Sequence, residues 1–179
     1  MSLLPLANGG FYAGSSVFGG LFRATQGPKA DPDTVPDLWS WLVEQRATVV
    51  LNLTAWAEGG TTKSEDYVPG TAQGVVSDWQ GVHVRTLASS KLLQHLGDFG
   101  EATAVQLWKA EQPDNVRVVL VVQISSWPSG MLPQDGDSLA WLSLFCIRAD
   151  RSLRQQRGQP DPGLVVHCSS GNGRTGRRC

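Results

Sequence analysis

The sequence predicts an α/β fold in which a mixed, twisted central sheet is flanked by helices. Apolar residues recur at helical spacing in two stretches, 35–42 and 137–157. Short apolar and β-branched runs, among them 48–54 and 164–167, are typical of buried strands. Helical and strand patterns mixed along a chain of 179 residues favour a single domain spanning 1–179.

The first predicted helix follows a break at 31–36 that contains two prolines. Thr34 can cap the helix, and Pro36 suits its first turn. The residues at positions i, i+3, i+4 and i+7 form one apolar face: Val35, Leu38, Trp39 and Leu42.

The middle of the chain contains three weaker strand patterns. Residues 82–87 alternate weakly between apolar and polar. Residues 103–108 and 116–124 flank the segment 112–115, whose proline and Asx-type residues favour a turn, so we expect a hairpin. The arm at 103–108 also has enough Ala and Leu to form a helix instead.

The second helix, 137–157, has the strongest pattern, and Ser138 can cap its start. Its apolar face comprises Leu139, Leu142, Cys146 and Leu153. Two prolines at 158–163 end it, and 164–167 then predicts a strand that leads into the glycine-rich stretch 168–176.

This strand delivers a cysteine to a tight turn. Gly171 and Gly173 allow backbone N–H groups to face inward, and such a nest binds a tetrahedral anion. The planar guanidinium of Arg174 can donate two parallel hydrogen bonds to phosphate oxygens. The same positive field lowers a thiol pKa by several units from about 8.5, so Cys168 is expected to be a nucleophile already charged at neutral pH. Thr175 can donate a hydrogen bond to the sulfur.

Residues 167–176 resemble the phosphate-binding loop of the cysteine-dependent protein tyrosine phosphatases, which reads His-Cys-Ser-x-Gly-x-Gly-Arg-Thr-Gly. Three other stretches resemble family segments in the expected order. They are Ala-Thr-Gln-Gly-Pro at 24–28, a strand and loop at 48–69, and Ser-Ser-Trp-Pro at 125–128, the start of the Trp-Pro-Asp loop. The ordered matches begin near Phe11.

The resemblance implies hydrolysis of phosphotyrosine in proteins through a phosphocysteine intermediate, without a metal or cofactor. It implies that Cys168 attacks phosphorus while His167 and Thr175 support the thiolate, with Lys63 and Tyr67 behind them. The implied phosphate-binding residues are Ser169, Ser170, Gly171, Asn172, Gly173 and Arg174.

One departure from the family concerns the general acid. The family has an aspartate after Trp-Pro that protonates the leaving oxygen, whereas Ser129 stands there. Loss of such an acid typically lowers the rate about 10²–10⁴-fold. Asp135 or Asp137 can replace it only if the loop folds differently. A pseudophosphatase that binds phosphotyrosine or a partner without turnover is therefore an alternative.

The chain also resembles a family member shortened at both ends. Residues 175–179 offer one helical turn where the family has a long buried helix, and the family's N-terminal helices precede the match. An inactive fragment is thus a third interpretation, which a cooperative melt would contradict.

Composition excludes several other classes. The net charge of −1 argues against nucleic-acid binding through a broad basic face, and no apolar run approaches the length of a membrane span, so no direct membrane contact is expected. Three cysteines without a pairing pattern favour a cytoplasmic protein or the cytosolic portion of a membrane-anchored one. His83 and His95 lack the spacing of metal ligands, Lys29 is expected to be an ordinary surface charge, and the oligomeric state stays undetermined.

Overall fold

The computed structural model describes residues 2–5, 11–17, 22–70, 75–92, 100–127, 136–161 and 163–170. Its helices are α1 (Val35–Glu44) and α2 (Gly136–Arg157). The strands of the main sheet are β1 (Ser2–Pro5), β2 (Phe11–Val17), β3 (Phe22–Gln26), β4 (Val49–Asn52), β7 (Val76–Trp79), β8 (Val82–Lys91), β9 (Gly100–Lys109), β10 (Gln112–Ile124) and β11 (Leu164–Cys168). A separate small hairpin pairs β5 (Ala57–Glu58) with β6 (Thr61–Thr62).

Within these residues, nine strands form one sheet in the order β1-β2-β3-β11-β4-β10-β9-β8-β7. The central strands β3, β11, β4 and β10 are parallel, while the outer pairs are antiparallel. The mixed sheet that the sequence predicts is confirmed, and the apolar runs at 48–54 and 164–167 supply two of its inner strands.

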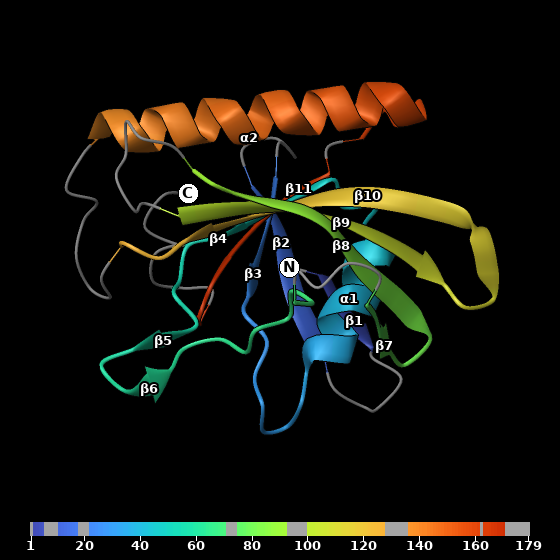
Figure 1. The fold of residues 1–179 in the computed structure, drawn as a ribbon, viewed down its shortest axis with the longest axis horizontal. Coiled ribbons are helices and arrows are strands. Elements are labelled where there is room, and N and C mark those ends of the chain that lie inside the picture. The colour runs from blue at the N-terminus through green and yellow to red at the C-terminus, as the bar shows by residue number, and fades with distance from the viewer. Residues whose placement is uncertain are drawn as a thin grey trace.

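The two helices lie on opposite faces of this sheet (Figure 1). Alternate residues of β4 pack beneath different helices, because successive side chains of a strand point to opposite faces of the sheet. Val50 belongs to the buried cluster beneath α1, whereas Val49 and Leu51 belong to the cluster beneath α2. A central strand buried on both faces explains why 48–54 is apolar without alternation.

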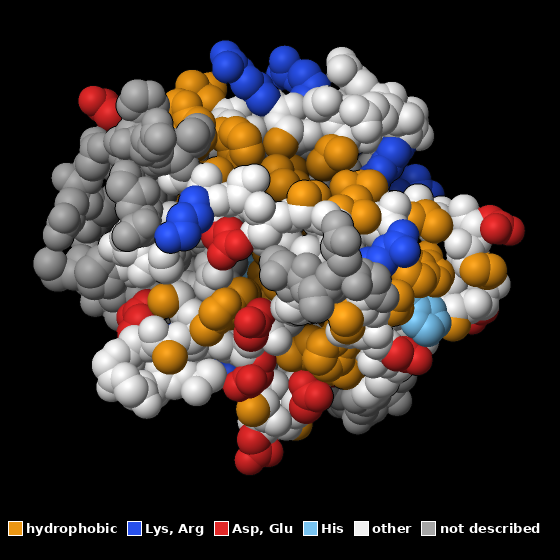
Figure 2. Space-filling model, in the orientation of Figure 1, with side chains coloured by type: hydrophobic (Ala, Val, Ile, Leu, Met, Phe, Trp, Pro, Cys, Tyr) orange, Lys and Arg blue, Asp and Glu red, His pale blue; other side chains and the backbone are white. Residues whose placement is uncertain are grey.

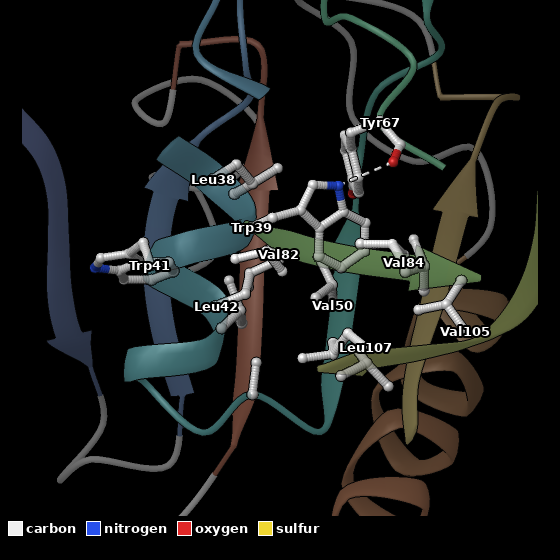
Figure 3. Close-up of a cluster of buried hydrophobic side chains, with 14 of the residues drawn as sticks. Leu38, Trp39, Trp41, Leu42, Val50, Tyr67, Val82, Val84, Val105 and Leu107 are labelled. Atoms are coloured by element: carbon white, nitrogen blue, oxygen red, sulfur yellow. Dashed lines mark hydrogen bonds between the residues drawn. The ribbon is translucent and has the colours of Figure 1, made fainter. Parts of the chain in front are cut away.

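Helix α1 packs through Leu38, Trp39 and Leu42, each no more than 1 % exposed (Figure 3). The predicted helix and its apolar face are confirmed. Thr34 occupies the N-cap position as predicted, but its side chain makes no cap bond and accepts the N–H of Lys29 at 2.9 Å instead. The carboxylate of Asp33 accepts the N–H of Val35 at 3.0 Å.

Helix α2 buries Leu142 and Cys146, as its periodicity predicts. Burial raises the pKa of the Cys146 thiol to about 12, so this cysteine is a core residue rather than a nucleophile. The helix begins at Gly136, ahead of Ser138, so the prediction that Ser138 caps it is wrong.

The outer surface of α2 is also partly apolar. Trp141, Leu144 and Ile147 are exposed on it, and hydrophobic side chains gather along this part of the surface in Figure 2. Charged residues are interspersed among them, and no helix in the described ranges has the length and hydropathy needed to cross a bilayer.

The predicted hairpin is confirmed as β9 and β10, so residues 103–108 form a strand and not a helix. The predicted position of the turn is wrong. The turn lies at residues 110–111, and segment 112–115 belongs to β10. The pairing register shifts between Gln112 and Arg117, and an irregular stretch of this kind tolerates Pro113, which has no N–H to donate to a ladder.

Candidate active site

Three parallel strands end together at the predicted nucleophile. Cys168 is the last residue of β11 and pairs with Gln26, the last residue of β3. On the other side, His167 pairs with Asn52, the last residue of β4. Open α/β sheets bind ligands at the carboxyl ends of their strands, so the fold puts Cys168 where a site is expected.

The peptide group that joins Cys168 to Ser169 is held by neighbouring segments at both its carbonyl and its N–H. Its carbonyl accepts the N–H of Gly27 at 2.7 Å, and the next N–H, that of Ser169, donates to the Thr54 hydroxyl at 3.2 Å. Thr54 is oriented in turn, because its own N–H donates to Asn52 at 2.9 Å. The cysteine, which is 3 % exposed, therefore leaves the sheet in a direction that β3 and β4 define.

Gly27 allows this close approach. A Cβ at Gly27 would lie 2.7 Å from Ser64 Oγ and 3.2 Å from both Cys168 O and His167 Nδ1. These separations are shorter than ordinary van der Waals contact, so a side chain here would push the segment after β3 away from the nucleophile.

His167 is fully buried directly before Cys168. Its Nε2 lies 2.7 Å from the hydroxyl of Tyr67, and burial lowers the pKa of the imidazole to about 4. His167 is therefore neutral at pH 7. It contributes a hydrogen bond that fixes the end of β11 and not a positive charge.

Tyr67 connects this histidine to the rest of the core. Its ring meets Trp39 edge-on at 5.8 Å and Trp56 at 5.3 Å. Its carbonyl accepts the indole N–H of Trp39 at 3.1 Å, the bond drawn in Figure 3. Helix α1 thus supports the end of β11 through one buried tyrosine.

The position of Lys29 differs from the prediction made from the sequence. From the sequence, Lys29 is expected to be an ordinary surface charge, whereas its ammonium donates to Ser169 Oγ at 3.2 Å and to the Lys63 carbonyl at 3.4 Å. The side chain is half-buried. A signal was present in the sequence, because Lys29 directly follows the segment 24–28 that matches the phosphatases.

The remaining predicted site residues are distributed as follows. Ser170 is exposed, and Asp137 lies exposed in the first turn of α2. Those outside the described residues are Gly171, Asn172, Gly173, Arg174, Thr175, Ser129 and Asp135. Their roles stay predictions.

No metal centre is evident in the part of the chain that the structure describes. Within it, no three His, Cys, Asp or Glu side chains come together as ligands. His83 stacks on Trp108 with ring centroids 5.5 Å apart, which is an aromatic contact within the sheet.

Comparison with known sequences decides the family. The sequence model described as Protein-tyrosine phosphatase matches residues 14–179. The chain belongs to this family. The match includes β3, β4 and β11, the strands whose ends meet at Cys168.

Individual relatives support the assignment. The chain is 30% identical over 165 residues to the rat tyrosine-protein phosphatase non-receptor type 9, which covers 88% of this chain and 26% of the relative. It is 28% identical over 149 residues to tyrosine-protein phosphatase 3 of Dictyostelium discoideum, covering 81% of this chain and 14% of the relative. It is 28% identical over 160 residues to the mouse receptor-type tyrosine-protein phosphatase C, covering 87% of this chain and 11% of the relative. The chain thus spans about a quarter or less of the length of these relatives.

Proposed function

We propose that residues 1–179 form one domain that hydrolyses phosphotyrosine in proteins through a phosphocysteine intermediate. The observation that carries this proposal is the position of Cys168. It is a buried cysteine at the carboxyl end of a central parallel strand, with the backbone around it held by Gly27 and Thr54, in a chain of the protein-tyrosine phosphatase family. Family relatives named as tyrosine-protein phosphatases support the substrate class.

In the first step the thiolate of Cys168 attacks phosphorus. The S–P bond forms as the bond from phosphorus to the tyrosine oxygen breaks, and that oxygen must gain a proton. Arg174 and the N–H groups of the loop after Ser169 neutralise the phosphoryl oxygens. While the Ser169 N–H donates to Thr54, as in this structure, it is not available to the phosphoryl group.

In the second step water attacks the phosphocysteine. The S–P bond breaks, inorganic phosphate leaves, and the thiolate of Cys168 returns, with Thr175 donating a hydrogen bond to the departing sulfur. His167 stays neutral and holds the strand end. The chemistry needs no oxidant or cofactor. A reducing compartment such as the cytoplasm suits it, because an oxidised cysteine cannot attack phosphorus.

Ser129 limits the first step. A serine hydroxyl does not release its proton usefully at neutral pH, so the tyrosine oxygen leaves without help from the position that the family uses. We expect a rate on phosphotyrosine about 10²–10⁴-fold below that of an enzyme with the acid. An aryl phosphate whose leaving group is already acidic needs little protonation, so its rate of hydrolysis should fall much less.

The same residue favours a second candidate, a pseudophosphatase that binds phosphotyrosine or a partner without turnover. The loop after Cys168 would then still bind the phosphate, and only the general acid that protonates the leaving oxygen would be missing. Turnover, and not binding, distinguishes the two functions.

The test compares the chain with Cys168→Ser on a phosphotyrosine peptide and on an aryl phosphate with a good leaving group. Hydrolysis of the aryl phosphate that Cys168→Ser abolishes, with slow hydrolysis of the peptide, is expected. Ser129→Asp should then raise the peptide rate selectively. Peptide binding without any Cys168-dependent turnover, from a folded chain, would support the pseudophosphatase instead.

A further inference from the structure

Lys29 brings an ammonium group to the residue that follows the nucleophile. Its Nζ donates to Ser169 Oγ at 3.2 Å and to the Lys63 carbonyl at 3.4 Å. Both acceptors are neutral, so these bonds orient the ammonium and leave its charge uncompensated. Within the described residues Lys29 forms no ion pair.

The acidic residues closest to Lys29 form no ion pair with it among the residues that the structure describes. Burial lowers the pKa of His167 to about 4, so the histidine is neutral, and it is hydrogen-bonded to Tyr67. Asp31 and Asp33 lie two and four positions further along the chain, and Glu65 lies alongside, since its N–H donates to the Pro28 carbonyl at 3.1 Å. Lys63, whose carbonyl accepts the Lys29 ammonium, belongs to a different segment and carries a positive side chain of its own.

The hydrogen bond to Ser169 places the Lys29 ammonium beside the residue that follows Cys168. Because the Ser169 oxygen accepts from Lys29, the one hydrogen of that hydroxyl remains available to another acceptor. An ammonium bonded to the oxygen polarises the hydroxyl and strengthens the bond it donates. A thiolate at Cys168 or a bound phosphoryl group is the kind of acceptor that gains from such a donor.

We propose that Lys29 is a positioning residue of the active site, which holds Ser169 and supplies a positive charge that stabilises the Cys168 thiolate and a phosphate bound beside it. This inference rests on the proposed function and deepens it. The family match over residues 14–179 includes Lys29, and the role proposed for Lys29 rests on its hydrogen bond to Ser169, 140 positions away in the chain.

The test uses Lys29→Met, which removes the charge and keeps the length, and Lys29→Arg, which keeps the charge. The main-chain N–H of Lys29, which donates to Thr34, is present in both variants, so the local turn retains that bond. Alkylation of Cys168 by iodoacetamide is followed against pH by mass spectrometry of the peptide that contains it. The inorganic phosphate concentration that half-protects Cys168 is measured in parallel.

We expect Lys29→Met to raise the midpoint of alkylation by roughly half to one pH unit, as Coulomb's law gives for one charge a few ångströms away in a partly solvated site. The phosphate concentration that half-protects Cys168 should rise about three- to tenfold, because a loss of free energy worth half to one pH unit corresponds to that ratio. Lys29→Arg should restore most of both values. Added salt should shrink the difference, because the site is only half-buried.

Lys109→Met is the matched control. Lys109 lies five positions beyond Ala104 at one end of the sheet, and Cys168 lies four positions beyond Leu164 at the other. The strand registers put Ala104 and Leu164 level, so the two residues are roughly 30 Å apart, which is several Debye lengths at ordinary salt. This variant should titrate as the parent does.

Two outcomes would overturn the proposal. One is a folded Lys29→Met whose Cys168 titrates and is protected like the parent. The other is a Lys29→Arg that behaves like Lys29→Met, since the shape and not the charge would then matter. Should Lys29→Met not fold, Lys29→Gln takes its place with the same criteria. Alkylation needs no turnover, so an inactive parent would count against the proposed function while the variants still decide the role of Lys29.

Discussion

His167 and Tyr67 form a buried hydrogen bond between residues 100 positions apart in the chain. At the scale of single residues, this pair shows how the neighbourhood of the nucleophile is held. The imidazole stays neutral because burial penalises its charged form. A protonated His167 is thus compatible with the unfolded chain and poorly compatible with the folded one, which makes stability depend on pH.

The sign of this dependence follows from the two pKa values. Between about 4 in the folded chain and an ordinary 6.5, the unfolded chain binds more protons, so stability is lost as the pH falls through this window. We expect the free energy of unfolding to drop by about 2 kcal/mol from pH 7 to pH 5 through His167. Asp37, whose pKa burial raises, acts in the opposite direction.

Urea unfolding at both pH values measures this effect, with His167→Gln as the comparison. The variant should be less stable at pH 7 and should lose less stability on acidification. An equal loss in both proteins would show that His167 is not the responsible group.

Gly27 provides a second prediction at this scale. Gly27→Ala introduces a Cβ 2.7 Å from Ser64 Oγ, and the neighbouring Cys168 and His167 atoms must also shift. We expect a loss of about 1–3 kcal/mol in the free energy of unfolding, together with slower alkylation of Cys168.

Gly70→Ala is the matched control, because no atom lies within 4 Å of a Cβ there. It should leave stability and alkylation almost unchanged. Adding Ser64→Ala to Gly27→Ala should recover part of the loss, and strict additivity of the two changes would contradict the steric explanation.

At the scale of elements, Asp150 joins α2 to the two central strands. Its carboxylate accepts the Thr48 hydroxyl at 2.5 Å and the Gly163 N–H at 3.0 Å, just before β4 and β11 begin. The other oxygen pairs with Arg154 at 2.9 Å, one turn further along the helix. This buried acid therefore sets the helix against the start of the strands whose far ends form the site.

Asp150→Ala should lower the free energy of unfolding by about 2–3 kcal/mol, because it leaves a buried N–H and a buried hydroxyl without their acceptor. Chemical denaturation measures the loss. Asp161→Ala, at an exposed acid on the following loop, should change stability by less than about 0.5 kcal/mol. Similar values for both variants would mean that the junction contributes little.

At the scale of the whole molecule, one sheet connects segments from both ends of the chain. Strands β1 to β3 lie on one side of β11, and β4 with β10 lies on the other. The two buried clusters share this sheet as their common wall. Loss of one central strand would expose both clusters, so we expect the chain to unfold as a unit.

The measurement is thermal unfolding followed by far-ultraviolet and near-ultraviolet circular dichroism, the latter reporting on the seven tryptophans. Coincident transitions are expected for a single cooperative domain. A strong far-ultraviolet signal without a near-ultraviolet transition would indicate loose packing and favour the interpretation of the chain as an inactive fragment.

The sequence by itself determined both helices, the inner strands β4 and β11, and the arrival of a strand at Cys168. These features are local, because an apolar period of 3.6 residues or a β-branched run is read from neighbouring residues. The family resemblance also predicts that Ser129 replaces the general acid, and this stays a prediction because Ser129 lies outside the described residues. The turn between β9 and β10 was misplaced because the local preference of Pro113 for a turn was outweighed by pairing along the two long strands.

Only the tertiary structure decided the contacts that hold the site. Tyr67 reaches His167, Lys29 reaches Ser169, and Asp150 reaches Thr48 across at least 100 positions of the chain. No local pattern distinguishes Asp150 from any polar residue on a helix, and only its position directly after the matching segment 24–28 distinguishes Lys29 from a solvated surface lysine. Their roles arise because parallel strands bring distant segments to the same edge of the sheet, and the burial created there makes each of those hydrogen bonds matter.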